Sequence, residues 1–255
     1  MKGHVTVNRD FWNASAPSWV TSGARGWAAE APVWGNWNAP ETELCLLPAD
    51  MHDMHAVELG CGTGYVSAWM ARRGARVTGI DVSAEQLATA RRFMAEHGLE
   101  ITFLEGNAEA TGLPSDRFDF AISEYGAAIW CDPDLWLPEA HRLLRPGGRL
   151  VFLGSHPMAL ITVPPNGAPC ERYLHRPYRD LTGADWTDVE IDPGGIEFNR
   201  TISGWMALFA RVGFDVLAYH ELYAPREAEG ERHSIPSAWA RDYPAEQVWV
   251  LHRRG

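Results

Sequence analysis

Apolar residues in the middle of the chain alternate between two arrangements. Short apolar runs bounded by glycine, proline or acidic residues indicate buried strands, and apolar residues recurring every three to four positions indicate helices. Runs of the first kind occupy 55–57, 75–80 and 101–104. Helix-like segments follow the first two, so the pattern predicts a doubly wound α/β sheet.

Several element boundaries are marked by specific residues. Ser83 with Gln86 three positions later forms a capping box, so a helix should begin there and end at Gly98. Pro138 should lie in the first turn of a helix that begins near Leu137 and ends before Pro146. Farther on, 200–212 is expected to be a helix, and 214–222 and 247–252 are expected to be strands.

The most informative segment runs from Val57 to Gly64, with the sequence Val-Glu-Leu-Gly-Cys-Gly-Thr-Gly. A strand, a tight turn and a helix start are expected here. Glycines in the turn let a ligand approach the bare backbone, and a helix N-terminus offers unpaired N–H groups. A nucleoside cofactor fits such a turn.

The glycine spacing distinguishes between two nucleoside cofactors. A dinucleotide site needs G-x-G-x-x-G, whose last glycine would fall at Tyr65, whereas here it falls at Gly64. Glu58 would repel a pyrophosphate but suits a cationic ligand that carries an amino acid. The pattern therefore favours S-adenosylmethionine.

Further motifs follow in order. Asp81 ends the second apolar run, Gly106-Asn107-Ala108-Glu109 follows the third, and 118–123 and 142–150 come next, the latter containing Pro146-Gly147-Gly148. On these motifs the chain resembles the class I S-adenosylmethionine-dependent methyltransferases, closely over 40–155 and loosely over 195–254. The family would use the acid at 81 for the ribose hydroxyls and 106–109 for adenine, where Asn107 replaces the commoner Asp.

The resemblance implies a mostly parallel, seven-stranded sheet of the Rossmann-like methyltransferase type, with an antiparallel C-terminal hairpin and an N-terminal helical lid. It implies S-adenosyl-L-methionine as cofactor and S-adenosyl-L-homocysteine as product. Cys61 suits the turn by its small size rather than as a nucleophile, and Tyr65 either touches the methionyl carboxylate or packs. The cofactor-binding residues expected are Glu58, Gly60, Cys61, Gly62, Gly64, Tyr65, Asp81, Val82, Gln86, Asn107, Ala108, Glu109 and Glu124.

Two segments outside this resemblance should select the substrate. Residues 1–44 hold five of the 12 tryptophans and are expected to form a lid on a core of 45–255, and a Pro- and Gly-rich insertion occupies about 156–195. Alternatively, the tryptophans anchor an N-terminal helix pair to the sheet. The substrate-binding residues expected are Trp34, Trp37, Tyr125, Trp130, His156 and Tyr173.

Methyl transfer needs mainly alignment, and a base is required only when the acceptor carries a proton. Candidate catalytic residues at the strand ends are Glu124, Tyr125 and His156. Other roles stay open for each: Glu124 balancing the sulfonium charge or pairing with an arginine, Tyr125 in packing, and His156 as a hydrogen-bonded loop histidine.

Charge and composition limit the kinds of binding partner that this protein is expected to have. The chain has 22 basic and 33 acidic residues, a net charge of −11, and no basic cluster, so a nucleic-acid substrate is not expected. With no long apolar run and no signal-peptide core, we expect a cytoplasmic monomer or homodimer that does not bind membranes. The four cysteines lack metal or disulfide spacing and are expected to be free thiols.

The remaining alternatives concern metals and function. Residues 50–55 contain Asp50, His52, Asp53 and His55, but they precede a strand as a polar loop, so no metal is expected.

The leading function is methylation of an O, N or C nucleophile on a small aromatic or hydrophobic metabolite, as in secondary metabolism. The alternative is a non-catalytic, S-adenosylmethionine-binding regulatory or interaction protein. A nicotinamide-dependent oxidoreductase is a weaker alternative, because its dinucleotide-binding motif needs glycine at position 65, where this chain has Tyr65.

Overall fold

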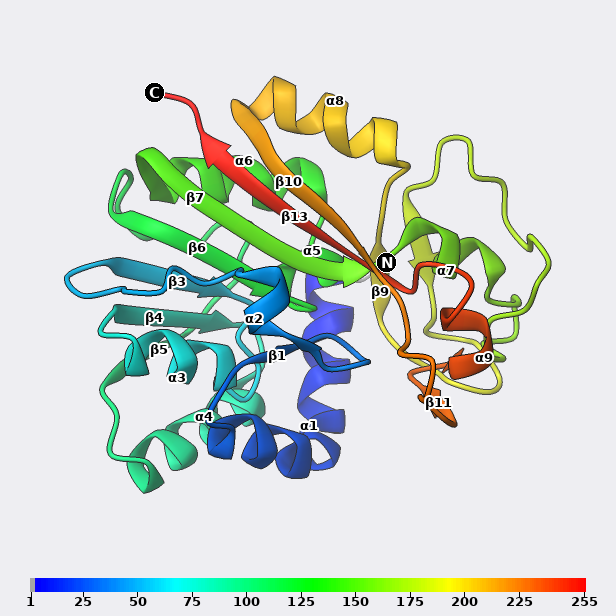
Figure 1. Ribbon diagram of the computed structural model, residues 1–255, viewed down its shortest axis with the longest axis horizontal. Helices are drawn as coiled ribbons and strands as arrows, with labels where there is room; N and C mark the ends of the chain where they lie inside the picture. Colours follow the sequence, from blue (N-terminus) through cyan, green and yellow to red (C-terminus); the bar gives the residue numbers. More distant parts are fainter. Residues whose placement is uncertain (1–2) are drawn as a thin grey trace.

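A seven-stranded sheet in the order β10-β13-β7-β6-β3-β4-β5 forms the centre of the fold (Figure 1). In the computed structural model, which describes residues 3–255, β13 is antiparallel to β7 and to β10, and the other six strands share one direction. The predicted mostly parallel sheet and its antiparallel C-terminal hairpin are confirmed. The strands are β3 (His55–Leu59), β4 (Arg76–Asp81), β5 (Ile101–Glu105), β6 (Phe118–Glu124), β7 (Leu144–Ser155), β10 (Phe214–Leu222) and β13 (Glu246–Arg253).

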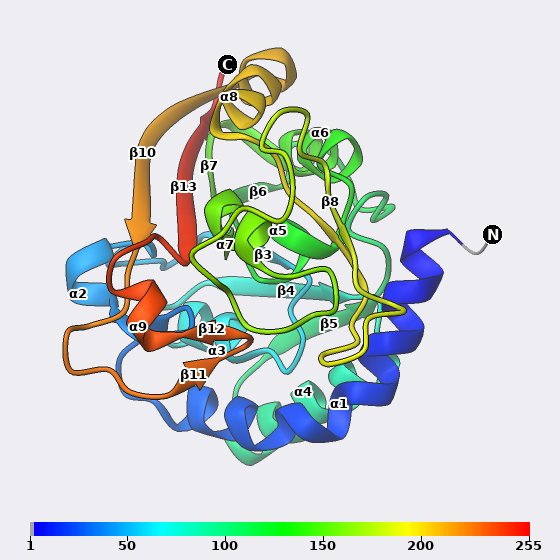
Figure 2. The ribbon, with the colours of Figure 1, turned by 90° about the vertical axis from the view of Figure 1, so that its right-hand side faces the viewer.

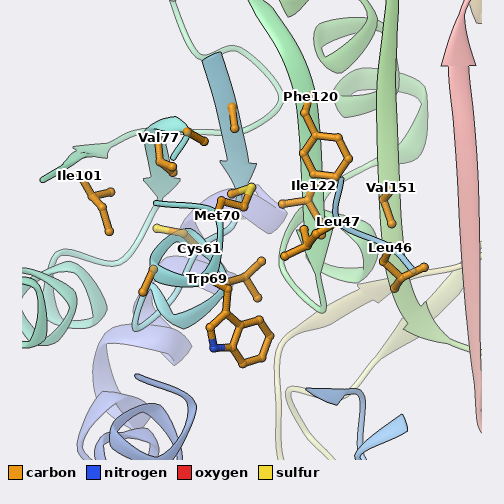
Figure 3. Packing of buried hydrophobic residues seen from close by; sticks show 14 of the residues in the cluster. Leu46, Leu47, Cys61, Trp69, Met70, Val77, Ile101, Phe120, Ile122 and Val151 are labelled. Atoms are coloured by element: carbon orange, nitrogen blue, oxygen red, sulfur yellow. The ribbon is translucent and has the colours of Figure 1, made fainter. Parts of the chain in front are cut away.

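Helices cover both faces of the sheet. One apolar layer, part of which Figure 3 shows, joins the sheet to α1, α3 and α4 and includes Trp27, Trp69 and Phe93. The other joins it to α5, α6 and α8 and includes Trp136 and Trp205. The helices are α1 (His4–Ala28), α2 (Glu41–Leu44), α3 (Tyr65–Arg72), α4 (Ala84–Glu96), α5 (Ala127–Trp130), α6 (Pro133–Leu143), α7 (Pro157–Thr162), α8 (Ile202–Val212) and α9 (Ser237–Ala240).

The expected cap of α4 is present in part. The Ser83 hydroxyl accepts a hydrogen bond from the backbone N–H of Gln86 at 3.1 Å, and the helix ends just before Gly98. The reciprocal half of a capping box is missing, because Oε1 of buried Gln86 has no hydrogen-bond partner.

Helix α6 begins four residues earlier than the sequence analysis predicted, at Pro133 rather than near Leu137. Asp132 caps it by accepting a hydrogen bond from Asp134 N at 2.9 Å, and Pro133 occupies the first helical position. Pro138 therefore lies inside the helix. Its missing N–H removes one helical bond, and burial of Trp136 and Leu137 offsets that loss.

The Pro146-Gly147-Gly148 segment lies within β7 rather than before it. Arg142 and Leu143 end α6, and the pairing of β7 with β6 shifts register between Phe118 and Phe120, opposite this segment. The Pro-Gly-Gly segment is thus an irregularity near the start of β7.

Segments between β7 and β13 gather beyond the carboxyl ends of the parallel strands, on the right in Figure 1 and toward the viewer in Figure 2. They contain α7, α9 and the hairpins β8 (Gly183–Asp185) with β9 (Ile196–Phe198) and β11 (Glu231–Arg232) with β12 (Ile235–Pro236). The N-terminal hairpin β1 (Val33–Trp34) with β2 (Ala39–Pro40) precedes α2. Within residues 3–255, no helix has the length and apolarity that crossing a bilayer demands.

Candidate functional site

The glycine turn links β3 to α3 at the carboxyl edge of the sheet. A side chain at Gly60 would meet the Gly126 backbone at 2.5 Å, and one at Gly64 would meet the Phe103 ring at 2.7 Å. A side chain at Gly62 would meet nothing within 4 Å. Two of the glycines therefore serve close packing, and Gly62 presents its backbone to open space, where a ligand can approach.

Asp81, the last residue of β4, faces the same turn. Its Oδ2 accepts a hydrogen bond from Gly62 N at 2.7 Å and its Oδ1 accepts one from Ser83 N at 2.8 Å. Burial raises the pKa of this carboxyl against the lowering effect of those N–H groups. A carboxylate held at the turn in this way is suited to accept hydrogen bonds from a vicinal diol.

Glu58 lies beneath the turn and is buried. The Ser67 hydroxyl donates to its Oε2 at 2.5 Å. Burial raises the pKa of Glu58 to about 8 despite that hydrogen bond, and the nearby carboxyl of Glu124 raises it further. A cationic ligand beside the turn would bring this pKa back down.

Glu124, at the end of β6, connects three segments. Its Oε2 accepts from the Tyr65 hydroxyl, and its Oε1 accepts from the backbone N–H of Gly35 at 3.2 Å. Tyr125 follows with φ of +53°, a left-handed conformation that non-glycine residues seldom adopt. Such strain is often found at functional sites, and here it directs the Tyr125 side chain toward β13.

The segment expected to contact adenine is fixed by local hydrogen bonds. Asn107 Oδ1 accepts from Glu109 N at 3.0 Å, and Glu109 Oε1 accepts from Asp132 N at 2.7 Å and bonds His4 Nε2 at 2.6 Å. Ala108 is buried. The contact with His4 brings the beginning of α1 to this end of the crevice.

Helix α1 packs against α3 and α4, and Figure 2 shows it running beside α4. The Trp27 indole N–H donates to Thr63 O at 2.7 Å, and the Ser83 hydroxyl donates to Asn13 Oδ1 at 2.8 Å. These bonds attach α1 to the glycine turn and to the cap of α4, so α1 covers both.

Three more residues expected near the cofactor differ in where their side chains lie. Cys61 is buried in the apolar layer between the sheet and α3 (Figure 3), and burial raises its pKa well above that of a free thiol. Val82 is half-buried beside Asp81, and Gln86 is buried on α4. Only the backbone of Cys61 belongs to the turn surface.

Sequence reasoning missed Glu246, the first residue of β13. It is fully buried, and its Oε1 accepts from the Tyr125 hydroxyl at 2.7 Å and from Asn36 N at 2.9 Å. Its Oε2 has no hydrogen-bond partner. Burial raises the pKa of Glu246 to about 7. An acid two positions before the apolar run 248–251 was the available signal, but the expected strand began one residue after Glu246.

His156 lies at the end of β7 as the N-cap of α7. Its Nδ1 accepts from Met158 N at 3.0 Å, and its Nε2 lies 3.1 Å from the Tyr219 hydroxyl and 3.4 Å from Glu221 Oε1. Burial lowers the pKa of His156 to about 4. Both ring nitrogens are thus engaged within the protein.

The aromatic residues expected to bind substrate are spread over different environments. Trp34 is fully buried against Trp69, and its indole N–H donates to Glu41 at 2.8 Å, which anchors the β1–β2 hairpin in the core. Trp37 joins an apolar cluster with residues of α7 and α9, and its indole N–H is buried without a partner. Trp130 packs edge to face against Trp12 of α1, and Tyr173 is 73% exposed.

No metal cluster is found in the part of the chain that the structure describes, residues 3–255. His52 and Asp50 hydrogen-bond to each other at 2.6 Å and are both exposed on the loop before β3.

Four carboxyl groups, those of Glu58, Asp81, Glu124 and Glu246, thus surround the turn and the adjoining strand ends. Within residues 3–255, no arginine or histidine forms an ion pair with any of them. Open space at Gly62 and an excess of buried and half-buried carboxyl groups suit a cationic nucleoside and disfavour a pyrophosphate. Fold and site together define a Rossmann-like domain of the kind that binds S-adenosylmethionine.

Comparisons with known proteins agree. Residues 57–152 match the model of a methyltransferase domain family. The chain superposes on a crystal structure of an S-adenosylmethionine-dependent methyltransferase from Mesorhizobium loti with a TM-score of 0.66 and 27% identity, covering 83% of this chain and 96% of that one. The core of the chain therefore resembles the S-adenosylmethionine-dependent methyltransferases in sequence, and the chain shares their fold.

Two curated relatives match the core. The chain is 39% identical over 134 residues to a demethylmenaquinone methyltransferase from Thermus thermophilus, covering 52% of this chain and 57% of the relative. It is 35% identical over 128 residues to 2-methyl-6-phytyl-1,4-hydroquinone methyltransferase 2, chloroplastic, from Oryza sativa subsp. japonica, covering 48% of this chain and 36% of the relative. The chain thus spans less than two thirds of the length of each.

Proposed function

We propose that this protein transfers the methyl group of S-adenosylmethionine to an O, N or C nucleophile of a small aromatic or hydrophobic metabolite. The observation that carries the proposal is the set of buried and half-buried acids around the open backbone of Gly62. The names of the curated relatives, which are methyltransferases of quinone-type compounds, support a small-molecule acceptor.

In this proposal the chain's own residues bind and align the reactants. Asp81 accepts hydrogen bonds from the ribose hydroxyls, and Gly62 leaves room for the nucleoside. Residues 107–109 lie against adenine. The cofactor supplies a methyl group already activated by its sulfonium. Glu58 and Glu124 balance positive charge at the methionyl end, where Tyr65 orients Glu124. Alignment in a water-excluded site then accounts for most of the acceleration.

We propose a division of labour between the segments outside the core. The described part of the N-terminal segment, residues 3–44, closes the cofactor site, because α1 is bonded to the glycine turn and the β1–β2 hairpin to Glu124 and Glu246. The insertion at about 156–195 and the cluster around Trp37 form the acceptor side. A net charge of −11 disfavours nucleic acid and anionic membranes as partners.

The tryptophans bear on the alternative, a regulatory protein that binds a partner through exposed aromatic residues. Trp27, Trp34 and Trp37 are buried, and Trp12 and Trp19 are half-buried. None of them offers the extended apolar surface that a docked partner needs. This burial supports the enzyme rather than the interaction protein.

Asp81→Ala tests the cofactor site. Loss of charged hydrogen bonds to two hydroxyls should weaken S-adenosylmethionine binding by roughly 2–4 kcal/mol, measured by titration calorimetry. Asp215→Ala, which removes an exposed carboxylate on β10, is the control and should bind as the wild type does. An unchanged affinity in Asp81→Ala would remove this residue from the site.

A further inference from the structure

We propose that Glu246 is a catalytic residue that receives the proton of the acceptor, and that the acceptor is therefore a hydroxyl compound of the phenol or enol class. This inference rests on the proposed methyl transfer and names the chemistry of its acceptor.

Glu246 lies at the edge of the sheet where the parallel strands end. Its backbone pairs with Ser155 at the end of β7, so its side chain lies at the carboxyl edge of the parallel strands. Its hydrogen-bond partner Tyr125 directly follows Glu124, which in turn contacts Tyr65 at the beginning of α3. Glu246 thus lies close to the glycine turn, on the side away from Asp81.

The hydrogen bonds of Glu246 occupy only one of its two carboxyl oxygens. Tyr125 and Asn36 both donate to Oε1, which holds the carboxyl in one orientation, and Oε2 is left without a partner. A fully buried carboxylate oxygen with no donor is costly, so the fold retains it for a ligand. An O–H group on the acceptor would supply the missing donor.

Neighbouring groups add two more unpartnered atoms. Glu197 on β9 has a buried Oε1 with no partner, and its charge raises the pKa of Tyr125 together with the charges of Glu246 and Glu124. The indole N–H of Trp37, next to Asn36 in the turn of the β1–β2 hairpin, is also free. Two acceptors and one donor match a polar aromatic ligand better than a hydrocarbon.

Burial supports the role of Glu246 as a base. Its pKa is raised to about 7 by burial and by Glu124, against the lowering effect of Tyr125 and Asn36. A base acts most effectively when its pKa is near the working pH. His156, whose pKa is lowered to about 4, is a much weaker base at neutral pH.

The proposed step balances. The O–H bond of the acceptor breaks and its proton goes to Oε2 of Glu246. The oxygen's electron pair forms the new bond to the methyl carbon, while the carbon–sulfur bond breaks and its electron pair stays on sulfur. The products are a methyl ether and a neutral thioether, and Glu246 then releases the proton to water.

The binding test compares 2-naphthol with 2-methylnaphthalene, probes that differ only by hydroxyl against methyl, on protein loaded with S-adenosylhomocysteine. Calorimetry should show that the wild type prefers 2-naphthol by about tenfold or more, as for a hydrogen bond to a charged group. Glu246→Gln should reduce this preference to less than about threefold, since the amide oxygen is uncharged. Glu227→Gln, at an exposed site, is the matched control.

The kinetic test follows methylation of 2-naphthol with S-adenosylmethionine across pH. Wild-type turnover should rise with pH, with a midpoint near the pKa of Glu246. Glu246→Gln should lower turnover by about 10²-fold or more and should abolish its rise with pH. Tyr125→Phe removes a hydrogen bond that lowers this pKa, so its midpoint should move to higher pH. A merely structural role of Glu246 would not predict that movement.

The outcomes separate the two proposals. A wild type that binds S-adenosylmethionine but shows no preference for 2-naphthol overturns the hydroxyl acceptor, as does a Glu246→Gln variant with the wild-type preference and pH profile. Loss of cofactor binding in Glu246→Gln would also overturn it, because the residue would then act on the cofactor. A wild type that does not bind S-adenosylmethionine overturns the proposed function itself.

Discussion

Two buried carboxyl groups make the stability of the ligand-free protein depend on pH. Burial raises the pKa of Glu58 to about 8 and that of Glu246 to about 7, from an ordinary value of 4.5. A raised pKa in the folded state stabilises the fold below the unfolded pKa, and this contribution is lost as pH rises through the folded pKa. The ligand-free protein should therefore be less stable at pH 8.5 than at pH 5.

Glu246→Gln removes one of these two titrations. The fall in unfolding free energy between pH 5 and pH 8.5 should then be smaller by about 3 kcal/mol, the value of the pKa difference. Urea unfolding of ligand-free protein at both pH values measures it, with Glu227→Gln as control. Parallel pH dependences in the variant and the wild type would mean that Glu246 titrates normally in the folded state.

Among the elements, α1 lies in direct contact with the glycine turn. A side chain at Gly23 would lie 2.6 Å from the Thr63 hydroxyl, and one at Gly26 would lie 2.7 Å from the Tyr65 ring. Glycine at these positions lets the helix backbone lie directly on the glycine turn. The helix can therefore position the turn without a side chain between them.

Gly23→Ala tests this contact. Alanine is favoured over glycine in a helix by about 1 kcal/mol, so an uncrowded site would gain stability. Here crowding against Thr63 should outweigh the gain and destabilise the protein by about 1–3 kcal/mol, with weaker S-adenosylmethionine binding. Ser18→Ala, exposed on the same helix, is the control for thermal unfolding and calorimetry. A more stable Gly23→Ala variant would show that α1 does not press on the turn.

Over the whole molecule, acidic side chains dominate the charge, and the site shares this character. A ligand that binds only the folded state stabilises a protein by about 2.7 kcal/mol when its concentration is one hundred times its Kd. S-Adenosylmethionine, which has a net positive charge, should therefore raise the melting temperature at saturating concentration. NAD should not, because its pyrophosphate would meet Glu58 and Glu124 where a dinucleotide site offers uncharged backbone. A comparable shift with NAD would contradict the cofactor assignment.

Local sequence patterns predicted the elements whose boundaries depend on neighbouring residues. The glycine turn, the Ser83 cap of α4 and the paired strands β10 and β13 are each specified within a few positions, because spacing and capping act over one or two turns of chain. The start of α6 was mispredicted because a local rule places proline in the first turn of a helix. In the fold, burial of Trp136 and Leu137 stabilises a helix with Pro138 in its interior. Trp34 and Trp37 have similar sequence surroundings but lie in different clusters.

By itself, the sequence determined the class of fold and the glycine turn between β3 and α3, since both are encoded in short, contiguous motifs. Only the tertiary structure decided which groups meet across the carboxyl edge of the sheet. Tyr125 and Glu246 are 121 positions apart, and only the insertion of β13 between β7 and β10 brings them into contact. The pKa of Glu246 follows from burial, which depends on contacts from distant segments and which no local pattern records.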